Sequence, residues 1–273
     1  MAGEFEGKVA LVTGASMGIG RASALAFARR GAKVVVADVD VAGGEETVRL
    51  IRKAGGEAIF AKTDVSNAAD VEALAKKTVA TYGKLDYAHN NAAINRGIGV
   101  MTAAYKEEDW NIQVDVNLKG VFLCMKYEIP EMLKNPPRIK LPQGEYGKGV
   151  IVNTSSIGGV LGMPGATGYQ ATKAAVIQMT RVAAVDYCTK GIRVMAVLPG
   201  IIKTRMAELA IGSKPGGETI VGSLTPMARM GEPEEVAGPV VFLCSDEASY
   251  MTGSYIAVDG GALIPMPPTP KVF

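Results

Sequence analysis

Two side chains that could move a proton stand four residues apart, Tyr169 and Lys173 in the segment YQATK. At this spacing on a helix, both side chains project from the same face, one turn apart. A tyrosine with an ordinary pKa near 10 is a poor base at neutral pH, but a nearby lysine cation favours the phenolate and lowers that pKa. The pair therefore predicts a general acid/base other than histidine, although this spacing taken alone is a common coincidence.

Polar, turn-forming residues follow three of the predicted strands. They are NTSS at residues 153–156, NNAA at residues 90–93 and PGIIKT at residues 199–204. Because the carboxyl ends of parallel strands meet at one edge of a sheet, these segments are expected to converge on one crevice.

A glycine-rich turn joins the first predicted strand to the first helix, in the segment TGASMGIG. Its glycines let backbone N–H groups approach a pyrophosphate at the helix N-terminus. No Lys-Ser/Thr pair follows, which disfavours a P-loop. The turn therefore predicts a dinucleotide site, formed by Gly14, Ser16, Met17, Gly18, Ile19 and Gly20.

An acidic residue at the end of the second predicted strand favours NAD over NADP. Asp38 lies eighteen residues beyond Gly20, where a carboxylate accepts hydrogen bonds from the ribose hydroxyls and repels a 2′-phosphate. Met17 stands where a basic side chain could otherwise meet that phosphate, and Arg21 is expected to point along the following helix.

Short β-branched runs alternate with helix-patterned stretches along the whole chain. Seven strands are predicted, at residues 8–13, 33–37, 57–61, 86–89, 149–154, 192–198 and 255–258. Strands that are apolar on both faces and separated by helices predict a parallel sheet covered on both sides. The expected fold is a single α/β domain over residues 1–273, a doubly wound, Rossmann-like sheet.

Three segments depart from this alternation. Residues 135–148 form a proline-broken insertion, residues 204–230 are expected to be a substrate lid, and residues 263–273 form a proline-rich tail.

Composition excludes several classes of function. Lys and Arg number 29 against 27 Asp and Glu, a balance that argues against nucleic-acid or membrane partners. No apolar run reaches the length of a membrane helix, and the N-terminus has no signal-peptide pattern. Three scattered cysteines and one histidine predict no disulfide framework and no zinc site, so a reduced, cytoplasmic protein is expected.

The remaining candidate residues are expected to be structural. His89 is predicted to be a core histidine with a backbone partner, and the three cysteines to be small hydrophobes on apolar helix faces. Trp110, Asp115 and Asp186 are expected to pack or to lie on helix surfaces.

Taken together, these motifs make the chain resemble the short-chain dehydrogenase/reductase family over about residues 5–262. The resemblance is carried by TGASMGIG, Asp64-Val65, NNAA, VDVNLKG, NTSS with YQATK, PGIIKT and the closing TGSYIAVDGG.

The resemblance implies a role for each matching position. Tyr169 would be the general acid/base, Lys173 would lower its pKa and hold the nicotinamide ribose, and Ser156, not Ser155, would position the substrate oxygen. Asn117 would hold a water that links Lys173 to solvent. Further cofactor contacts would come from Asp64 and Val65 at the adenine, Asn91 and Ala92 at the turn, and Pro199, Gly200, Ile202 and Thr204 near the carboxamide. A homotetramer or homodimer is implied.

One position departs from the family pattern, because Ala93 stands where NNAG has glycine. If that position required a positive φ, alanine would cost about 1 kcal/mol.

The expected function is an NAD(H)-dependent oxidoreductase that interconverts a secondary alcohol and a ketone. Pocket walls at residues 94–96, 157–163 and 206–225 are mainly aliphatic, which predicts a moderately apolar, cyclic or aryl substrate. An NADPH-dependent 3-oxoacyl reductase is the alternative enzyme, a non-catalytic dinucleotide-binding regulator is the alternative of another class, and a lyase or epimerase is a weaker third.

Overall fold

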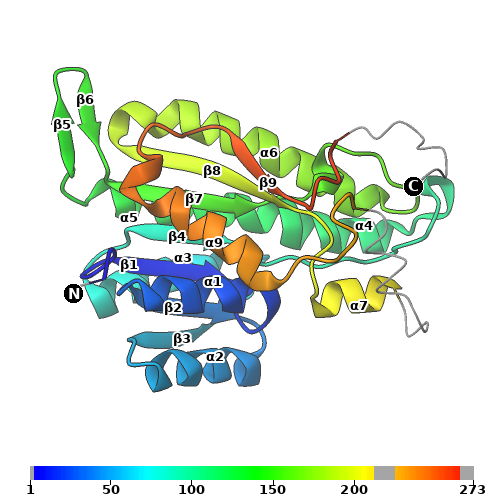
Figure 1. Cartoon of the computed structure of the whole chain (residues 1–273), viewed down its shortest axis with the longest axis horizontal. Helices are drawn as coiled ribbons and strands as arrows, with labels where there is room; N and C mark the ends of the chain where they lie inside the picture. The colour runs from blue at the N-terminus through cyan, green and yellow to red at the C-terminus, as the bar shows by residue number, and fades with distance from the viewer. Residues whose placement is uncertain (1–2, 212–224, 265–273) are drawn as a thin grey trace.

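The computed structural model describes residues 3–211 and 225–264, and seven parallel strands form its centre (Figure 1). Each strand is a short run of β-branched and small apolar residues. In sheet order the strands are β3 (Ala58–Lys62), β2 (Lys33–Asp38), β1 (Val9–Thr13), β4 (Tyr87–Asn90), β7 (Gly149–Thr154), β8 (Ile192–Pro199) and β9 (Tyr255–Val258). The order reverses between β1 and β4, so the predicted doubly wound parallel sheet is confirmed.

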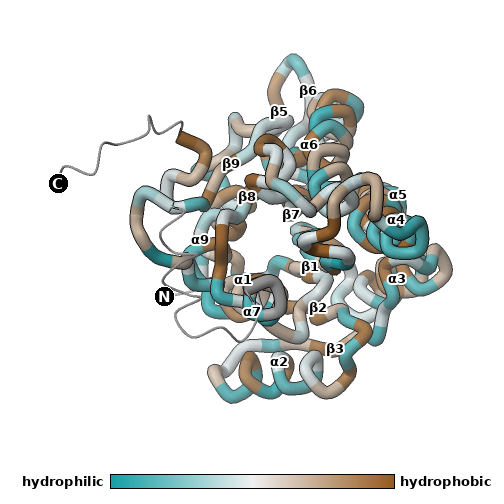
Figure 2. The backbone as a smooth tube through the Cα atoms, turned by 90° about the vertical axis from the view of Figure 1, so that its right-hand side faces the viewer, coloured by the Kyte–Doolittle hydropathy of each residue, from teal (hydrophilic) through white to brown (hydrophobic). Residues whose placement is uncertain are grey.

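Helices cover both faces of this sheet (Figure 2). One face carries α1 (Gly18–Arg29), α2 (Val41–Lys53) and α9 (Pro233–Cys244). The other face carries α3 (Ala68–Tyr82), α5 (Gly120–Leu133) and α6 (Thr167–Tyr187).

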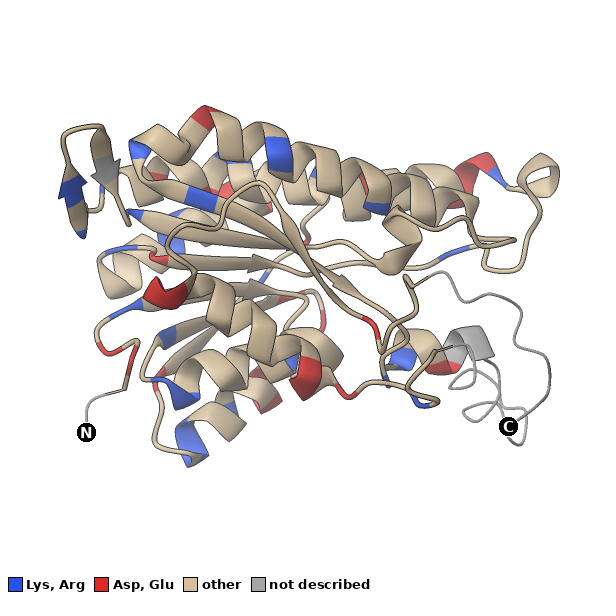
Figure 3. Ribbon diagram, turned by 45° about the horizontal axis from the view of Figure 1, so that its top comes forward, with Lys and Arg blue, Asp and Glu red and all other residues tan. Residues whose placement is uncertain are grey.

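Both faces of the central strands are therefore buried. In β1, Ala10 and Val12 pack into the core on one face and Leu11 into the core on the other. The strands carry few charged residues, as Figure 3 shows, because neither face meets water.

A π-helical segment interrupts the fourth predicted helix. The sequence predicts one helix over residues 106–133, whereas the structure has α4 (Glu107–Gln113), a π-helical segment (Val114–Lys119) and then α5. The prediction of an uninterrupted helix is wrong here. Wide helical turns of this kind are frequent at functional sites, and this one contains Asn117.

The insertion at residues 135–148 contains a short antiparallel hairpin, β5 (Ile139–Leu141) and β6 (Gly144–Tyr146). It projects from the amino-terminal end of the sheet, opposite α4 (Figure 1). The sequence predicts only an irregular insertion at this place. A hairpin of this size is marginal alone, so its anchoring must come from the rest of the domain.

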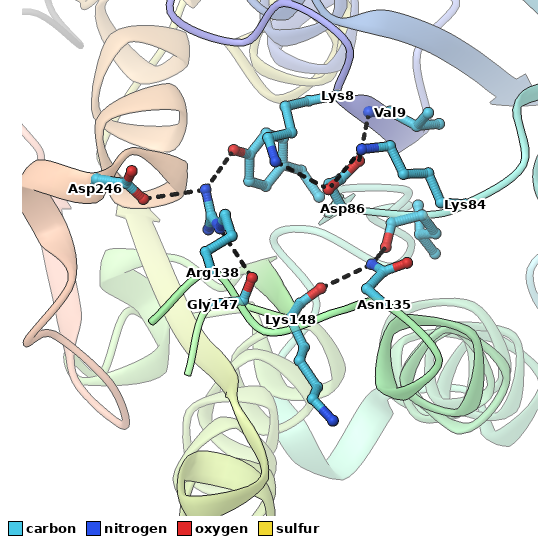
Figure 4. Close-up of polar contacts among 11 residues, drawn as sticks. Lys8, Val9, Lys84, Asp86, Asn135, Arg138, Gly147, Lys148 and Asp246 are labelled. Atoms are coloured by element: carbon cyan, nitrogen blue, oxygen red, sulfur yellow. Dashed lines mark hydrogen bonds and ion pairs between the residues drawn. The ribbon is translucent and has the colours of Figure 1, made fainter. Parts of the chain in front are cut away.

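Two side chains anchor this insertion (Figure 4). The buried amide of Asn135 donates to the carbonyls of Leu85 at 2.7 Å and Lys148 at 2.8 Å. Arg138 donates to the Gly147 carbonyl at 2.9 Å and pairs with Asp246 at 3.0 Å.

The predicted lid at residues 204–230 is described only in part. Its first residues form a short helix, α7 (Arg205–Ile211), and residues 225–230 return toward α9. Residues 212–224 and residues 265–273 of the predicted tail lie outside the described residues.

Replacing Asn135 by alanine is expected to destabilise the domain. The variant loses two buried hydrogen bonds, which costs about 1–3 kcal/mol of unfolding free energy. Urea unfolding measures the change. Lys134→Ala is the control, because Lys134 is 67% exposed and its pair with Glu131 is worth at most about 1 kcal/mol. Equal stability of the two variants would contradict the anchoring role.

Candidate active site

The glycine-rich turn packs directly against the segment that follows β4. A Cβ at Gly14, whose φ is +63°, would lie 2.8 Å from the Ala92 Cα atom. A Cβ at Gly20 would lie 2.1 Å from the Gly14 carbonyl oxygen. Larger residues at these two positions would therefore force the strand ends apart.

Asn91 holds the two strand ends together. Its side-chain amide donates to the carbonyls of Thr13 at 3.2 Å and Gly14 at 3.3 Å. In return, the Thr13 hydroxyl accepts from the backbone N–H groups of Asn91 at 3.0 Å and Ala92 at 3.2 Å.

The first turn of α1 keeps its N–H groups available for an anion. Met17 precedes the helix without capping it through its side chain, and the first turn contains no acidic residue. Unpaired N–H groups and the helix dipole both favour a pyrophosphate at this place. Thr204, from the segment after β8, approaches the same turn, since its methyl group would lie 3.2 Å from a Cβ at Gly18.

Asp38 lies beside this turn at the end of β2. Its Oδ2 atom accepts from the Ser16 N–H at 2.9 Å and its Oδ1 atom from the Asp40 N–H at 2.9 Å. The carboxylate is therefore fixed at the sheet edge.

Arg21 does not follow the axis of α1, so that prediction is wrong. Its side chain crosses to α2, where it donates to the Thr47 hydroxyl at 3.0 Å and the Gly43 carbonyl at 3.2 Å, and it also donates to the Ser16 carbonyl. Three acceptors in reach draw the guanidinium away from the helix surface.

The other predicted cofactor residues lie along the same edge. The exposed Asp64 accepts from the N–H and hydroxyl of Ser66 at 2.9 and 2.7 Å, and the buried Val65 packs against Gly120. After β8, the Gly200 N–H donates to the Val258 carbonyl at 2.9 Å, and Ile202 is buried.

Lys173 is buried at the carboxyl end of β7. Its side chain is 1% exposed, and its Nζ atom donates to the Thr154 carbonyl at 2.8 Å. The same Nζ atom lies 5.7 Å from the centre of the Tyr169 ring, so the predicted proximity of the two side chains is present.

The two serines after β7 have different partners. The Ser155 hydroxyl donates to the Lys173 carbonyl at 2.7 Å and is committed to the backbone. The Ser156 hydroxyl accepts from the Gly158 N–H at 3.1 Å and lies close enough to Tyr169 to lower its pKa. Ser156 is therefore the hydroxyl that reaches the tyrosine.

Desolvation dominates the ionisation of the buried Lys173 and of the half-buried Tyr169. It raises the pKa of Tyr169, and the nearby Ser156 hydroxyl only partly opposes it. Burial also lowers the pKa of Lys173, to about 8. The sequence predicts a lowered tyrosine pKa, but in the protein alone the pKa is raised, because desolvation of the phenolate outweighs the stabilisation that the polar neighbours provide.

Asn117 braces the π-helical segment against the segment after β4. Its side chain accepts from the Ile94 N–H at 2.8 Å and donates to the Ile94 carbonyl at 2.8 Å. Its Nδ2 atom also lies 3.5 Å from the Thr172 hydroxyl, next to Lys173 in the chain.

Ala93, which stands where the family has glycine, does not adopt a positive φ. Ala228 is the one non-glycine residue with a positive φ in the described part of the chain, so the cost considered for Ala93 does not arise.

His89 is fully buried and lies close to this site. Its Nε2 atom lies 2.8 Å from the Thr154 hydroxyl, and burial, aided by the charge of Lys173, lowers its pKa to about 3. It is a neutral core histidine, as predicted, but its partner is a side-chain hydroxyl. Thr154, part of the NTSS segment, contacts both His89 and Lys173, a role that the sequence does not assign to it.

The described residues contain neither a candidate metal cluster nor a helix that could span a membrane. Residues 3–211 and 225–264 contain no cluster of three or more His, Cys, Asp or Glu side chains that could hold a metal ion. None of the helices in these ranges is long and apolar enough to cross a membrane.

Comparison with known proteins decides the family. The family model described as enoyl-(acyl carrier protein) reductase matches residues 14–262, which span the dinucleotide turn and the Tyr169–Lys173 pair. The chain belongs to the short-chain dehydrogenase/reductase family. It is therefore an oxidoreductase whose family uses NAD(P) and acts on alcohol or keto groups.

Several dehydrogenases and reductases in this family are similar over nearly their whole length. A 2,5-dichloro-2,5-cyclohexadiene-1,4-diol dehydrogenase from Sphingobium indicum is 41% identical, covering 94% of this chain and 98% of that protein. A cyclohexanol dehydrogenase from Acinetobacter sp. is 40% identical, covering 95% of this chain and 96% of that protein. The crystal structure of levodione reductase superposes with a TM-score of 0.85 at 34% identity, covering 94% of this chain and 97% of that structure.

The buried Lys173 predicts how stability changes at alkaline pH. Its pKa is about 8 in the folded protein and 10.5 when unfolded, so the unfolded state binds more protons between these values. Stability from this group therefore rises with pH across that window, by on the order of 3 kcal/mol at about 1.4 kcal/mol per unit. Lys173→Met should lack this rise. Urea unfolding of both proteins between pH 7 and 10.5 measures the difference, and parallel curves would contradict the buried cation.

Proposed function

We propose that the protein is an NAD(H)-dependent oxidoreductase that interconverts a secondary alcohol and a ketone. The observation that carries the proposal is the grouping of Ser156, Tyr169 and the buried ammonium of Lys173, whose Nζ atom lies 5.7 Å from the centre of the Tyr169 ring. This group of side chains lies at the edge of a turn whose glycines and free N–H groups fit a dinucleotide.

When bound, NAD⁺ would accept a hydride from the substrate carbon. In alcohol oxidation, Tyr169 takes the hydroxyl proton and Ser156 holds the substrate oxygen. Lys173 stabilises the phenolate and holds the nicotinamide ribose. Because Tyr169 has a raised pKa in the protein alone, the positive charge of the nicotinamide ring of bound NAD⁺ is required to bring it into the range of a base.

We infer that the proton leaves through Lys173 toward Asn117. The Asn117 side chain is committed to Ile94, so it acts by holding this part of the backbone next to Thr172 and Lys173. A water placed there would connect the ammonium to solvent.

Preference for NAD over NADP is supported by the charges at the end of β2. Asp38 is fixed by two backbone N–H groups beside the turn, where it would accept from ribose hydroxyls and repel a 2′-phosphate. Arg21 is held by Ser16, Gly43 and Thr47, which withdraws the nearest cation from a phosphate.

An apolar, cyclic or aryl substrate is supported by the loops at this edge. Exposed apolar side chains gather on the segments after β4 and β7: Ile98, Met101, Val160, Leu161 and Met163. The Gly99 N–H donates to the Gly165 carbonyl at 2.7 Å, which joins the two segments into one wall. The diol dehydrogenase, cyclohexanol dehydrogenase and levodione reductase that resemble this chain agree with such a substrate by their names.

We also propose a homotetramer or homodimer in the cytoplasm. Apolar side chains on the outer faces of α5 and α6 are exposed, among them Phe122, Val182 and Val185, the last at 77%. A second copy of this chain would cover them. Multi-angle light scattering tests the assembly, and a monomer at micromolar concentration would contradict it.

Tyr169→Phe is expected to lower kcat for oxidation of cyclic secondary alcohols by about 10³-fold, since it removes the proton acceptor. NAD⁺ binding should be nearly unchanged, because the ring and Lys173 remain. Initial rates and a fluorescence titration measure both quantities.

Tyr187→Phe is the matched control, because Tyr187 lies on the same helix and its ring contact with Lys190 survives the change. Undiminished turnover by Tyr169→Phe would reject the proposed base. NAD⁺ binding by both variants without turnover on any alcohol would favour the non-catalytic regulator.

Asp38→Ser is expected to weaken NAD⁺ binding by about tenfold, because it removes hydrogen bonds to a charged acceptor worth about 1.5–3 kcal/mol. NADP⁺ binding should strengthen at the same time, since the repulsion is lost. Glu45→Gln, on the exposed surface of α2, controls for charge alone. A wild-type preference for NADP⁺ would reverse this assignment and favour the 3-oxoacyl reductase.

A further inference from the structure

A carboxyl group lies buried beside the sheet, next to the proposed site but outside it. Glu128, on the sheet-facing side of α5, is 1% exposed. Its Oε2 atom accepts from the side-chain amide of Asn90, the last residue of β4, at 3.0 Å. No cation pairs with it among the described residues, which is unusual for a carboxylate removed from water.

The side-chain amide of Asn90 begins a chain of hydrogen bonds in which each group donates to the next. It donates its second N–H to the Oδ1 atom of Asn153 at 3.1 Å. Asn153 in turn donates to the Thr180 hydroxyl at 3.0 Å, and Thr180 donates to the Val176 carbonyl at 2.9 Å. Both N–H groups of Asn90 are thus in use, and its Oδ1 atom must be the remaining acceptor.

Two oxygens in this cluster have no hydrogen-bond donor. They are Oε1 of Glu128 and Oδ1 of Asn90, both buried. They are the second oxygens of two planar groups that already share one hydrogen bond. An ionised Glu128 would leave both oxygens unsatisfied, whereas a proton on Oε1 supplies the donor that both lack.

We propose that Glu128 is kept as a neutral carboxylic acid whose O–H group donates a hydrogen bond to the Oδ1 atom of Asn90. Together with the hydrogen bond from the Asn90 amide to Glu128, this closes a ring of two hydrogen bonds. Glu128 is thereby a positioning residue for the ends of β4 and β7. An acid and an amide are complementary in this arrangement, since each group gives one donor and one acceptor.

The groups around Glu128 are consistent with a neutral acid. Asn90 on β4, Asn153 on β7 and Thr180 on α6 are uncharged, and Cys124, one turn earlier on α5, is the titratable neighbour. Burial raises the pKa of Glu128 to about 7, against a smaller lowering by Asn90, and raises the pKa of Cys124 as well.

The ring connects to the proposed reaction through its neighbours in the chain, so this step rests on the proposed function. Asn91, which follows Asn90, holds the glycine-rich turn, and Ser156 lies three residues after Asn153. A shift of Asn90 would therefore displace both the cofactor turn and the serine.

Infrared difference spectroscopy tests the protonation directly and does not depend on turnover. Wild type minus Glu128→Gln at pH 5.5, below the pKa of about 7, should show the C=O band of a protonated carboxyl that shifts in D₂O. Glu131→Gln, on the same helix and paired with Lys134, is the control and should show only a carboxylate difference. A carboxylate signal for Glu128 would overturn the proposal.

Thermal unfolding gives an independent readout. The folded-state pKa of Glu128 lies above its unfolded value, so its stabilising contribution is present at low pH and is lost as pH rises toward about 7. The unfolding temperature of wild type should therefore fall relative to Glu128→Gln between pH 4.5 and 7. No relative change would contradict a neutral acid.

Kinetics separates positioning from mere burial. Glu128→Gln can form the same ring and should keep kcat/KM within about twofold. Glu128→Leu leaves one N–H and the Oδ1 atom of Asn90 without a partner and should lower kcat/KM about tenfold. If Glu128→Leu does not fold, the kcat/KM of Glu128→Gln and the infrared difference spectrum still test the proposal. Equal loss in both variants would overturn the positioning role. Absence of turnover in all proteins, with the infrared band present, would count against the proposed function alone.

Discussion

The buried ammonium of Lys173 is the constraint on which the rest of the site depends. Removing a cation from water costs several kcal/mol unless fixed acceptors compensate. Here the compensation comes from the Thr154 carbonyl at 2.8 Å, so β7 must end at this residue and α6 must pass beside it. Ser155 strengthens the same junction by donating to the Lys173 carbonyl. The serine that follows is then left free to face Tyr169.

A second set of contacts joins this junction to the dinucleotide turn. The Thr154 hydroxyl lies 2.8 Å from His89 and 3.4 Å from the Asn91 side chain, which in turn holds Thr13 and Gly14. On the other face of β4, Asn90 connects to Asn153 and Glu128. Side chains on both faces of the strand therefore fix its end, where the proposed cofactor and substrate would meet.

The fold could be predicted from the sequence, and so could the segments that meet at the edge of the sheet, because both rest on local patterns. Apolar runs marked the seven strands, and short motifs marked their polar ends. The π-helical segment around Asn117 and the pairing of Asn90 with Glu128 could not, because they depend on tertiary packing and the paired residues are 38 positions apart. The ionisation of Tyr169 was also missed, since the cost of burial has no signal in residue spacing.

The most direct test is the pKa of Tyr169 with and without dinucleotide, measured by NMR of ring-labelled tyrosine and assigned with Tyr169→Phe. The proposed mechanism predicts a pKa above 10 in the free protein, because burial dominates, and a clear fall when NAD⁺ binds. NADH, which lacks the positive charge, should lower it less. An unchanged pKa on NAD⁺ binding would contradict the claim that Tyr169 becomes the base through the charge of the bound cofactor.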